Sequence, residues 1–89
     1  MVARESSCVA AILAALNTRP DCLVRKLHGD VYSVAGDPDV YGVLAGRHLC
    51  LEVKVPGGDV SALQWLRLRQ WSRAGALVAV VTVVRPWSR

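Results

Sequence analysis

Two carboxylates and a lysine, Asp39, Glu52 and Lys54, fall within a short apolar part of this 89-residue chain. Carboxylate oxygens are hard ligands of the kind that Mg²⁺ or Mn²⁺ prefers, with water and phosphate oxygens completing an octahedron. A lysine beside such a metal can polarise its bound water or stabilise the negative charge that builds on a phosphate under attack. If the three side chains meet, their types indicate hydrolysis of a phosphodiester.

The element that must position these residues is a β-hairpin. Two apolar runs, 39–44 and 47–55, have the composition of strands, and Ala45-Gly46 between them is a plausible two-residue turn. The pairing of the strands then follows from the length of the turn.

The register of this hairpin decides whether the charged residues meet. A two-residue turn places Asp39 directly opposite Glu52, with Lys54 on the same face of the sheet. Opposed like charges cost roughly 0.2 to 1 kcal/mol unless a positive group lies between them. A turn of odd length, or a bulge at Gly42, would move the two carboxylates to opposite faces.

Two helices are predicted to flank the strands. Apolar residues at helical spacing predict the first at roughly 3–17, and a capping box formed by Ser61 and Gln64 begins the second, which ends near Gly75. Glu5 lies on the same side of the first helix as its apolar stripe, so we expect its carboxylate to face the interior or a cleft. Alternatively, Glu5 only stabilises the positive end of its helix.

Two further strands complete the predicted fold. Residues 22–28 are apolar enough for one, and the uncharged, β-branched run at 76–84 is typical of a fully buried one. The helix between 47–55 and this last run makes a right-handed crossover, so the two strands should be parallel. The order αβββαβ predicts an α/β protein, a single domain over 1–89 with a mixed sheet flanked by helices.

The composition is that of a folded globular protein, with 53% hydrophobic and 20% charged residues. The three cysteines show no C-x-x-C spacing, so neither a disulfide framework nor a zinc knuckle is indicated, and we expect a reducing compartment. No apolar run reaches ~18 residues, and the run at 8–16 lacks the flanks of a signal peptide. We therefore expect a cytoplasmic protein without a membrane span.

The excess of basic residues suggests a polyanionic partner. Nine of the eleven basic residues are arginine, whose planar fork matches phosphate oxygens. If three of the seven acidic residues gather at the candidate site, four remain to balance the eleven basic ones, which is typical of a protein that binds a polyanion. Arg67, Arg69 and Arg73 on the second helix are candidate phosphate contacts, or simply its solvated side.

Short motifs occur in a definite order along almost the whole chain. They are Glu5 in the first helix, Gly36-Asp37-Pro38-Asp39, Glu52-Val53-Lys54, Ser61-Ala62-Leu63-Gln64 and Ala74-Gly75-Ala76. In this order the chain resembles the VRR-NUC family of the PD-(D/E)XK nuclease superfamily. A short D…E-x-K pattern alone is weak, but its agreement with the hairpin register and the order of elements strengthens it.

The resemblance implies a metal-dependent DNA endonuclease with a PD-(D/E)XK nuclease-like core. It implies Asp39 and Glu52 as ligands of Mg²⁺ or Mn²⁺, Lys54 as the catalytic lysine, Gln64 as an active-site support and Glu5 as an additional acidic group. Small stand-alone members are expected to be homodimers from bacteria or phages. This favours structure-selective cleavage of branched or duplex DNA, as by a Holliday junction resolvase.

Each candidate residue also has a simpler interpretation. Asp39, Glu52 and Lys54 could be edge-strand charges that face solvent and discourage aggregation, and Gln64 could serve only the capping box. His48 falls on the face of Glu52, but an edge histidine near a turn is commoner than a general base.

The alternatives for the whole chain are a nicking or flap nuclease module, a catalytically inactive nucleic-acid-binding relative, and a small interaction module. The presence of both carboxylates and the lysine disfavours a lapsed enzyme, which need not keep all three. Trp65 and Trp71 are expected to pack within the protein and not to stack on bases.

Overall fold

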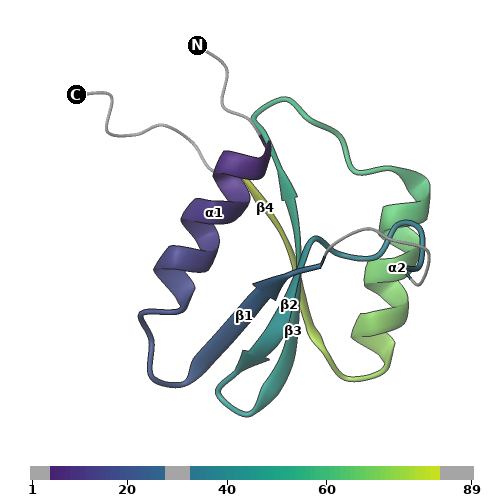
Figure 1. Cartoon of the computed structure of the whole chain (residues 1–89). Helices are drawn as coiled ribbons and strands as arrows, with labels where there is room; N and C mark the ends of the chain where they lie inside the picture. The colour runs from purple at the N-terminus through teal and green to yellow at the C-terminus, as the bar shows by residue number, and fades with distance from the viewer. Residues whose placement is uncertain (1–4, 28–32, 83–89) are drawn as a thin grey trace.

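The computed structural model describes residues 5–27 and 33–82, which form two helices and four strands (Figure 1). In chain order the elements are α1 (Glu5–Leu16), β1 (Cys22–Lys26), β2 (Val40–Leu44), β3 (Arg47–Lys54), α2 (Ala62–Arg73) and β4 (Leu77–Thr82). This is the predicted order αβββαβ, and the α/β class is confirmed.

The strand boundaries differ slightly from the predicted ones. β1 ends at Lys26, and His28, the predicted last residue of this strand, lies outside the described residues. Asp39 immediately precedes β2, and β3 ends one residue before Val55. Residues 83 and 84 of the last predicted strand also lie outside the described residues.

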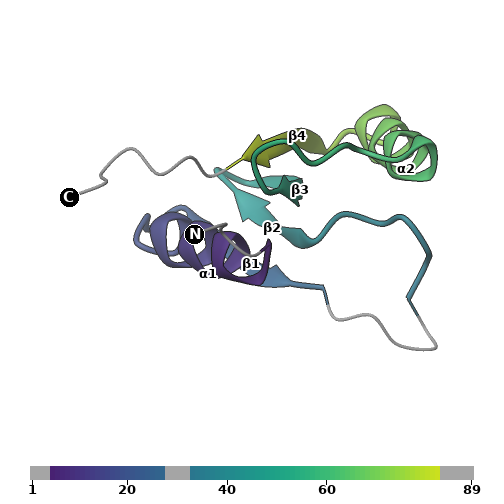
Figure 2. The ribbon, with the colours of Figure 1, turned by 90° about the horizontal axis from the view of Figure 1, so that it is seen from above.

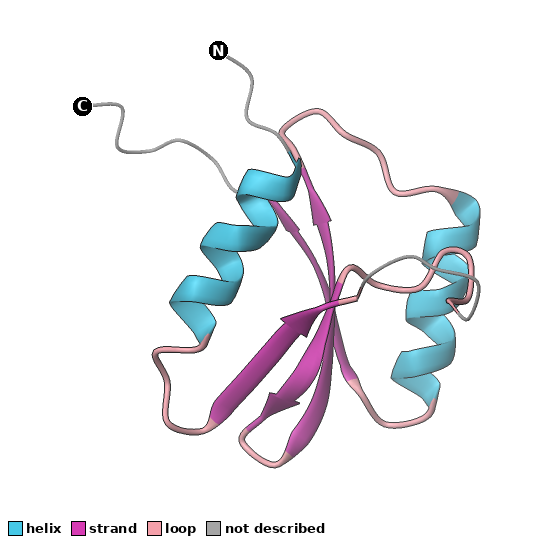
Figure 3. Ribbon diagram, in the orientation of Figure 1, coloured by secondary structure: helices cyan, strands magenta, loops and turns pink. Residues whose placement is uncertain are grey.

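The four strands form one mixed sheet in the order β1-β2-β3-β4. β2 is antiparallel to both of its neighbours, whereas β3 and β4 are parallel, as the strand-helix-strand connection predicts. α1 contacts β1 and β3 on one face of the sheet, and α2 contacts β3 and β4 on the other (Figures 2 and 3). The sheet therefore lies between two helices, which share β3 and otherwise cover opposite edge strands.

The β2–β3 hairpin has the predicted register. Ala45 and Gly46 make its turn with φ of 50° and 81°, the left-handed pair typical of a type I′ turn. The five residue pairs follow one another without a bulge. At Gly42 a Cβ atom would collide with the carbonyl oxygen of Leu23, so this glycine lets β1 approach closely instead of bending the strand.

The hydrophobic core lies between α1 and the sheet. Leu49, Leu51 and Val53 alternate along β3 and belong to this core, together with Cys8, Val9, Ile12, Cys22, Val24 and Val40. Cys50 and Glu52 alternate with them and are also buried, on the face that α2 covers. β3 is therefore buried on both faces, and only its second face carries a charged side chain into the interior.

β4 is less buried than its composition predicts. It lies at the edge of the described sheet next to β3, and Ala79, Val80 and Thr82 are exposed. The prediction of a fully buried strand is wrong for the described part of 76–84. A β-branched composition reports a preference for strand, not the number of neighbours that the strand acquires.

α2 begins and ends as predicted. The Ser61 side chain accepts a hydrogen bond from the backbone N–H of Gln64 at 3.1 Å, and the Gln64 side-chain oxygen accepts the Ser61 N–H at 2.9 Å. Gly75 follows the last turn with φ of 108°, the left-handed conformation that ends many helices. No helix in 5–27 or 33–82 is long and apolar enough to cross a membrane.

Candidate active site

Asp39 and Glu52 lie beside each other at the start of β2. The pairing of Val40 with Leu51, continued by one residue, sets Asp39 opposite Glu52. Asp39 Oδ2 accepts the backbone N–H of Val53 at 2.9 Å, which fastens the segment before β2 to β3. The structure therefore brings the two predicted carboxylates together.

The segment before Asp39 is held by α2. Arg67 Nε donates to the carbonyl oxygen of Ala35 at 3.0 Å, and Trp71 Nε1 donates to Asp37 Oδ1 at 3.2 Å. These two bonds connect residues more than thirty positions apart in the chain, and they position the loop that carries Asp39.

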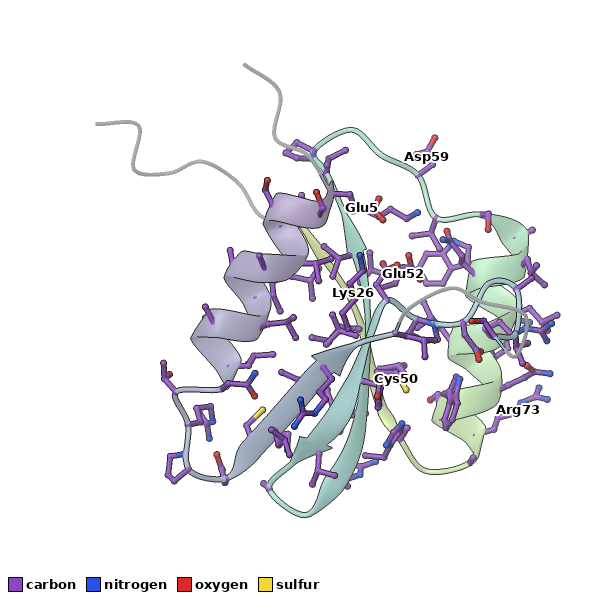
Figure 4. All side chains as sticks on the ribbon, in the orientation of Figure 1. Glu5, Lys26, Cys50, Glu52, Asp59 and Arg73 are labelled. Carbon is purple, nitrogen blue, oxygen red and sulfur yellow. The ribbon has the colours of Figure 1, made fainter. Side chains whose placement is uncertain are left out.

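Glu52 is fully buried, with 0% of its surface exposed (Figure 4). Burial, together with the neighbouring Asp39 carboxylate, raises the pKa of Glu52 to about 8, against a partial lowering by Lys54. Its Oε1 is buried and has no hydrogen-bond partner among the described residues. A buried carboxyl group with an unpaired oxygen is costly for the fold, and a carboxyl pKa raised by burial and a neighbouring charge makes Glu52 a candidate functional residue.

Lys54 and Gln64 meet at the other oxygen of Glu52. Lys54 Nζ lies 3.6 Å from Glu52 Oε2, and Gln64 Nε2 donates to the same atom at 3.1 Å. The lysine side chain is 13% exposed, so this ion pair is largely shielded from solvent. Gln64 therefore serves the capping box and the candidate site at once.

The interpretation of these residues as solvent-facing edge charges is wrong. β2 and β3 are both interior strands of the described sheet, and Glu52 has no contact with solvent. A charge that only discourages aggregation belongs on an exposed edge.

Glu5 occupies the rim of this site. It is the first residue of α1 and is exposed, so its carboxylate does not face the interior, one of the two places expected for it, and the other, a cleft, stays a prediction. Its negative charge nevertheless contributes to the raised pKa of Glu52, and Figure 4 shows it near Glu52 at the same end of the sheet. Because Glu5 lies in the first turn, its negative charge also interacts favourably with the positive end of the α1 helix dipole.

The oxygen atoms at this site fit a divalent cation such as Mg²⁺ or Mn²⁺. No group of three or more His, Cys, Asp or Glu side chains that could hold a metal occurs in the described part of the chain. Mg²⁺, however, usually takes one or two protein carboxylates and keeps several waters. The unpaired Oε1 of Glu52 and the carboxylate of Asp39 provide that number, and a cation there would offset their mutual repulsion.

The three arginines of α2 do not share one environment. Arg67 is half-buried and also bonds Gln70 Oε1 at 3.1 Å, so it holds the loop described above. Arg69 and Arg73 are exposed, and Arg73 lies at the end of α2 away from Glu52 (Figure 4). Only these last two remain available for phosphate contacts.

Sequence reasoning missed a pocket beside the candidate site. It has a volume of about 120 Å³, and its lining includes Asp37, Pro38, Tyr41, His48, Cys50 and Trp71. The alternation along β3, which sets His48 and Cys50 on the face of Glu52, is the signal that was available. His48 was expected at a sheet edge, but β3 is an interior strand and the His48 ring stacks on Trp71 with centroids 5.0 Å apart.

The two tryptophans of α2 also differ from each other. Trp71 packs against His48 as expected, although 36% of it is exposed. Trp65 is 50% exposed, so the expectation that it is a packing residue holds only in part.

Comparisons with known proteins add no relative to this picture. No protein family model matches the chain, and no curated protein matches it. The function proposed next therefore rests on the geometry of Asp39, Glu52, Lys54 and Gln64.

Proposed function

We propose that this chain is a metal-dependent DNA endonuclease of the PD-(D/E)XK type, similar to the VRR-NUC family, that hydrolyses phosphodiester bonds. The observation that carries the proposal is the buried Glu52, whose Oε1 has no partner, beside Asp39 and within 3.6 Å of Lys54. The same residues form the D…E-x-K pattern of the sequence.

Each residue has a distinct role in this proposal. Asp39 and Glu52 hold Mg²⁺ or Mn²⁺, which when bound supplies Lewis acidity and a nucleophilic water at neutral pH. Lys54 places its ammonium group where negative charge grows on the phosphate. Gln64 fixes the orientation of Glu52 through its amide, and Glu5 adds negative charge at the rim.

The metal ligands can be tested by calorimetry with Mn²⁺. We expect Asp39→Ala and Glu52→Gln to lose binding, because each removes a carboxylate oxygen from the site. Asp59→Asn is the matched control, since Asp59 is an exposed acid on the loop after β3 (Figure 4). Unchanged Mn²⁺ binding in Asp39→Ala would show that Asp39 is not a metal ligand.

The activity can be tested on four-way junctions, flaps, linear duplexes and single strands of one sequence. We expect cleavage with Mg²⁺ or Mn²⁺, none in EDTA, and none from Asp39→Ala. Binding without cleavage on every substrate would instead make the chain an inactive nucleic-acid binder, and neither binding nor cleavage would favour an interaction module.

We further propose that the working unit is a homodimer that acts on branched DNA, with a four-way junction as its substrate. Val80 on β4 is exposed beside α2. On the other face, a groove of about 330 Å³ between α1 and the sheet is lined by apolar residues that include Ile12, Leu16, Leu51 and Val81. A symmetric partner that packs against the edge strand β4 would bury apolar surface there, and its two-fold axis would match the near two-fold symmetry of a junction.

A further inference from the structure

The pocket lined by His48, Cys50 and Trp71 lies next to the candidate site along β3. Cys50, in its lining, precedes Glu52 by two residues on the same face of the strand (Figure 4). Two residues of a strand span roughly 6.6 Å, so Cys50 at the pocket is one strand repeat away from Glu52 at the candidate site. The pocket therefore lies where a nucleotide adjacent to a bound phosphate would reach.

Aromatic rings form the walls of this pocket. Tyr41 and Trp71 are 39% and 36% exposed, and His48 stacks on Trp71 with an interplanar angle of 29°. The bond from Trp71 Nε1 to Asp37 fixes the indole. Rings that are already oriented lose little freedom when a flat ligand stacks on them.

One polar atom of the lining residues has no hydrogen-bond partner among the described residues, although the exposed lining of the pocket is mostly apolar. His48 Nε2 is buried without a hydrogen-bond partner among the described residues, so it is free to donate to or accept from a ligand. Burial, with the charge of Asp37, raises the pKa of Cys50 to about 11, so the thiol at the pocket is neutral and does not act as a nucleophile. Arg25, the exposed partner of Tyr41 in the sheet, provides a positive charge beside the rings.

We propose that this pocket holds one unpaired nucleobase of the DNA strand whose phosphodiester lies at Asp39 and Glu52. The proposal rests on the nuclease function above and names its substrate class: DNA with an unpaired nucleotide next to the cleaved bond. A base inside a duplex presents no free face, so it enters only after leaving the stack. Flaps, open junction centres and single strands offer such a base at the least cost.

The fluorescence of Trp71 provides a test that does not depend on cleavage. The chain has three tryptophans, and Trp65→Phe with Trp87→Phe leaves Trp71 as the single emitter. In EDTA, a thymidine oligonucleotide of about eight residues should quench this emission. An abasic oligonucleotide of the same length and charge should not, and a blunt duplex should quench much less. Equal quenching by the abasic strand would overturn the proposal, as would quenching by thymidine monophosphate at the same concentration as the oligonucleotide.

Substitutions of Tyr41 test the stacking itself. Tyr41→Ala should weaken binding of the oligonucleotide by about 10-fold or more, whereas Tyr41→Phe keeps the ring and should stay close to the parent. Leu23→Ala is the matched control, because Leu23 is an exposed apolar residue on the neighbouring strand β1 and lies on the same face of the sheet as Tyr41. Equal affinities for parent and Tyr41→Ala would contradict the proposal.

Failure of this inference differs from failure of the nuclease function. Metal-dependent cleavage without base-dependent quenching would leave the nuclease in place and refute the pocket as a base site. Base-dependent quenching without cleavage on any DNA would support the pocket and refute the nuclease.

Discussion

The side-chain amide of Gln64 donates to Oε2 of Glu52 at 3.1 Å, so the first turn of α2 is joined directly to β3. The oxygen of the same amide accepts the Ser61 N–H at 2.9 Å. The capping box and the orientation of the buried carboxyl group thus depend on one side chain.

Two substitutions should separate these roles. Ser61→Ala removes the cap but keeps the Gln64 amide, so we expect the free energy of unfolding to fall by about 1 kcal/mol with cleavage nearly unchanged. Gln64→Ala should lose comparable stability and also about 10- to 100-fold in metal affinity or cleavage rate, as for other groups that orient metal ligands. Thermal melting and cleavage rates of both variants would separate the two roles of Gln64. Equal cleavage by the two variants would show that Gln64 serves only the helix cap.

The raised pKa of Glu52 predicts how stability depends on pH without metal. Its pKa of about 8 in the folded protein lies above the ordinary value of 4.5, so the folded state holds the proton over this interval and the unfolded state does not. In EDTA, the melting temperature of the parent should therefore fall as the pH rises from about 5 to about 8.

Glu52→Gln should remove this loss, because an amide has no proton to lose in this range. We expect its melting temperature to exceed that of the parent by several degrees near pH 8, where about 1 kcal/mol corresponds to 4–8 °C, and by little near pH 5. Asp59→Asn, at an exposed acid, should follow the parent. Parallel curves for parent and Glu52→Gln would show that Glu52 does not cause the dependence.

Lys54 should matter for cleavage more than for binding. Its Nζ lies 3.6 Å from Glu52 Oε2, and its charge stabilises most where negative charge grows in the transition state. We expect Lys54→Ala to bind a junction within about 2-fold of the parent and to cleave it about 100-fold or more slowly. The only other lysine of the chain, Lys26, is exposed on β1, and Lys26→Ala is the matched control. Equal cleavage by Lys54→Ala and the parent would end the assignment.

The parts of the fold that local chemistry determines were predictable from the sequence. A two-residue turn fixes the pairing of its strands, so Ala45-Gly46 was sufficient to place Asp39 opposite Glu52. The start and end of α2 were equally readable, because Ser61, Gln64 and Gly75 act on their own neighbours.

The parts that depend on distant contacts were not predictable. The Trp71 side chain reaches Asp37 across 34 positions, and no periodicity within either segment reports this contact. Burial was overestimated for the same reason at two positions: Val80 lies on an edge strand, and Glu5 begins a helix whose first turn is open to solvent.

The last prediction concerns the assembly. If β4 is the dimer surface, Val80→Lys, which places a charge on its exposed side, should change the mass in light scattering at micromolar concentration from two chains to one. Leu23→Lys changes an exposed apolar residue on β1, the strand at the opposite edge of the described sheet. This variant should keep the mass of two chains.

The parent should make paired, symmetric incisions in a synthetic four-way junction, because each 89-residue chain carries one candidate metal site and cuts one strand. A parent mass of one chain, with activity linear in protein concentration, would overturn the dimer. Cleavage confined to flaps or single strands would refute the junction as substrate and leave a nicking or flap nuclease, in which the exposed Arg69 and Arg73 would still make binding depend steeply on salt.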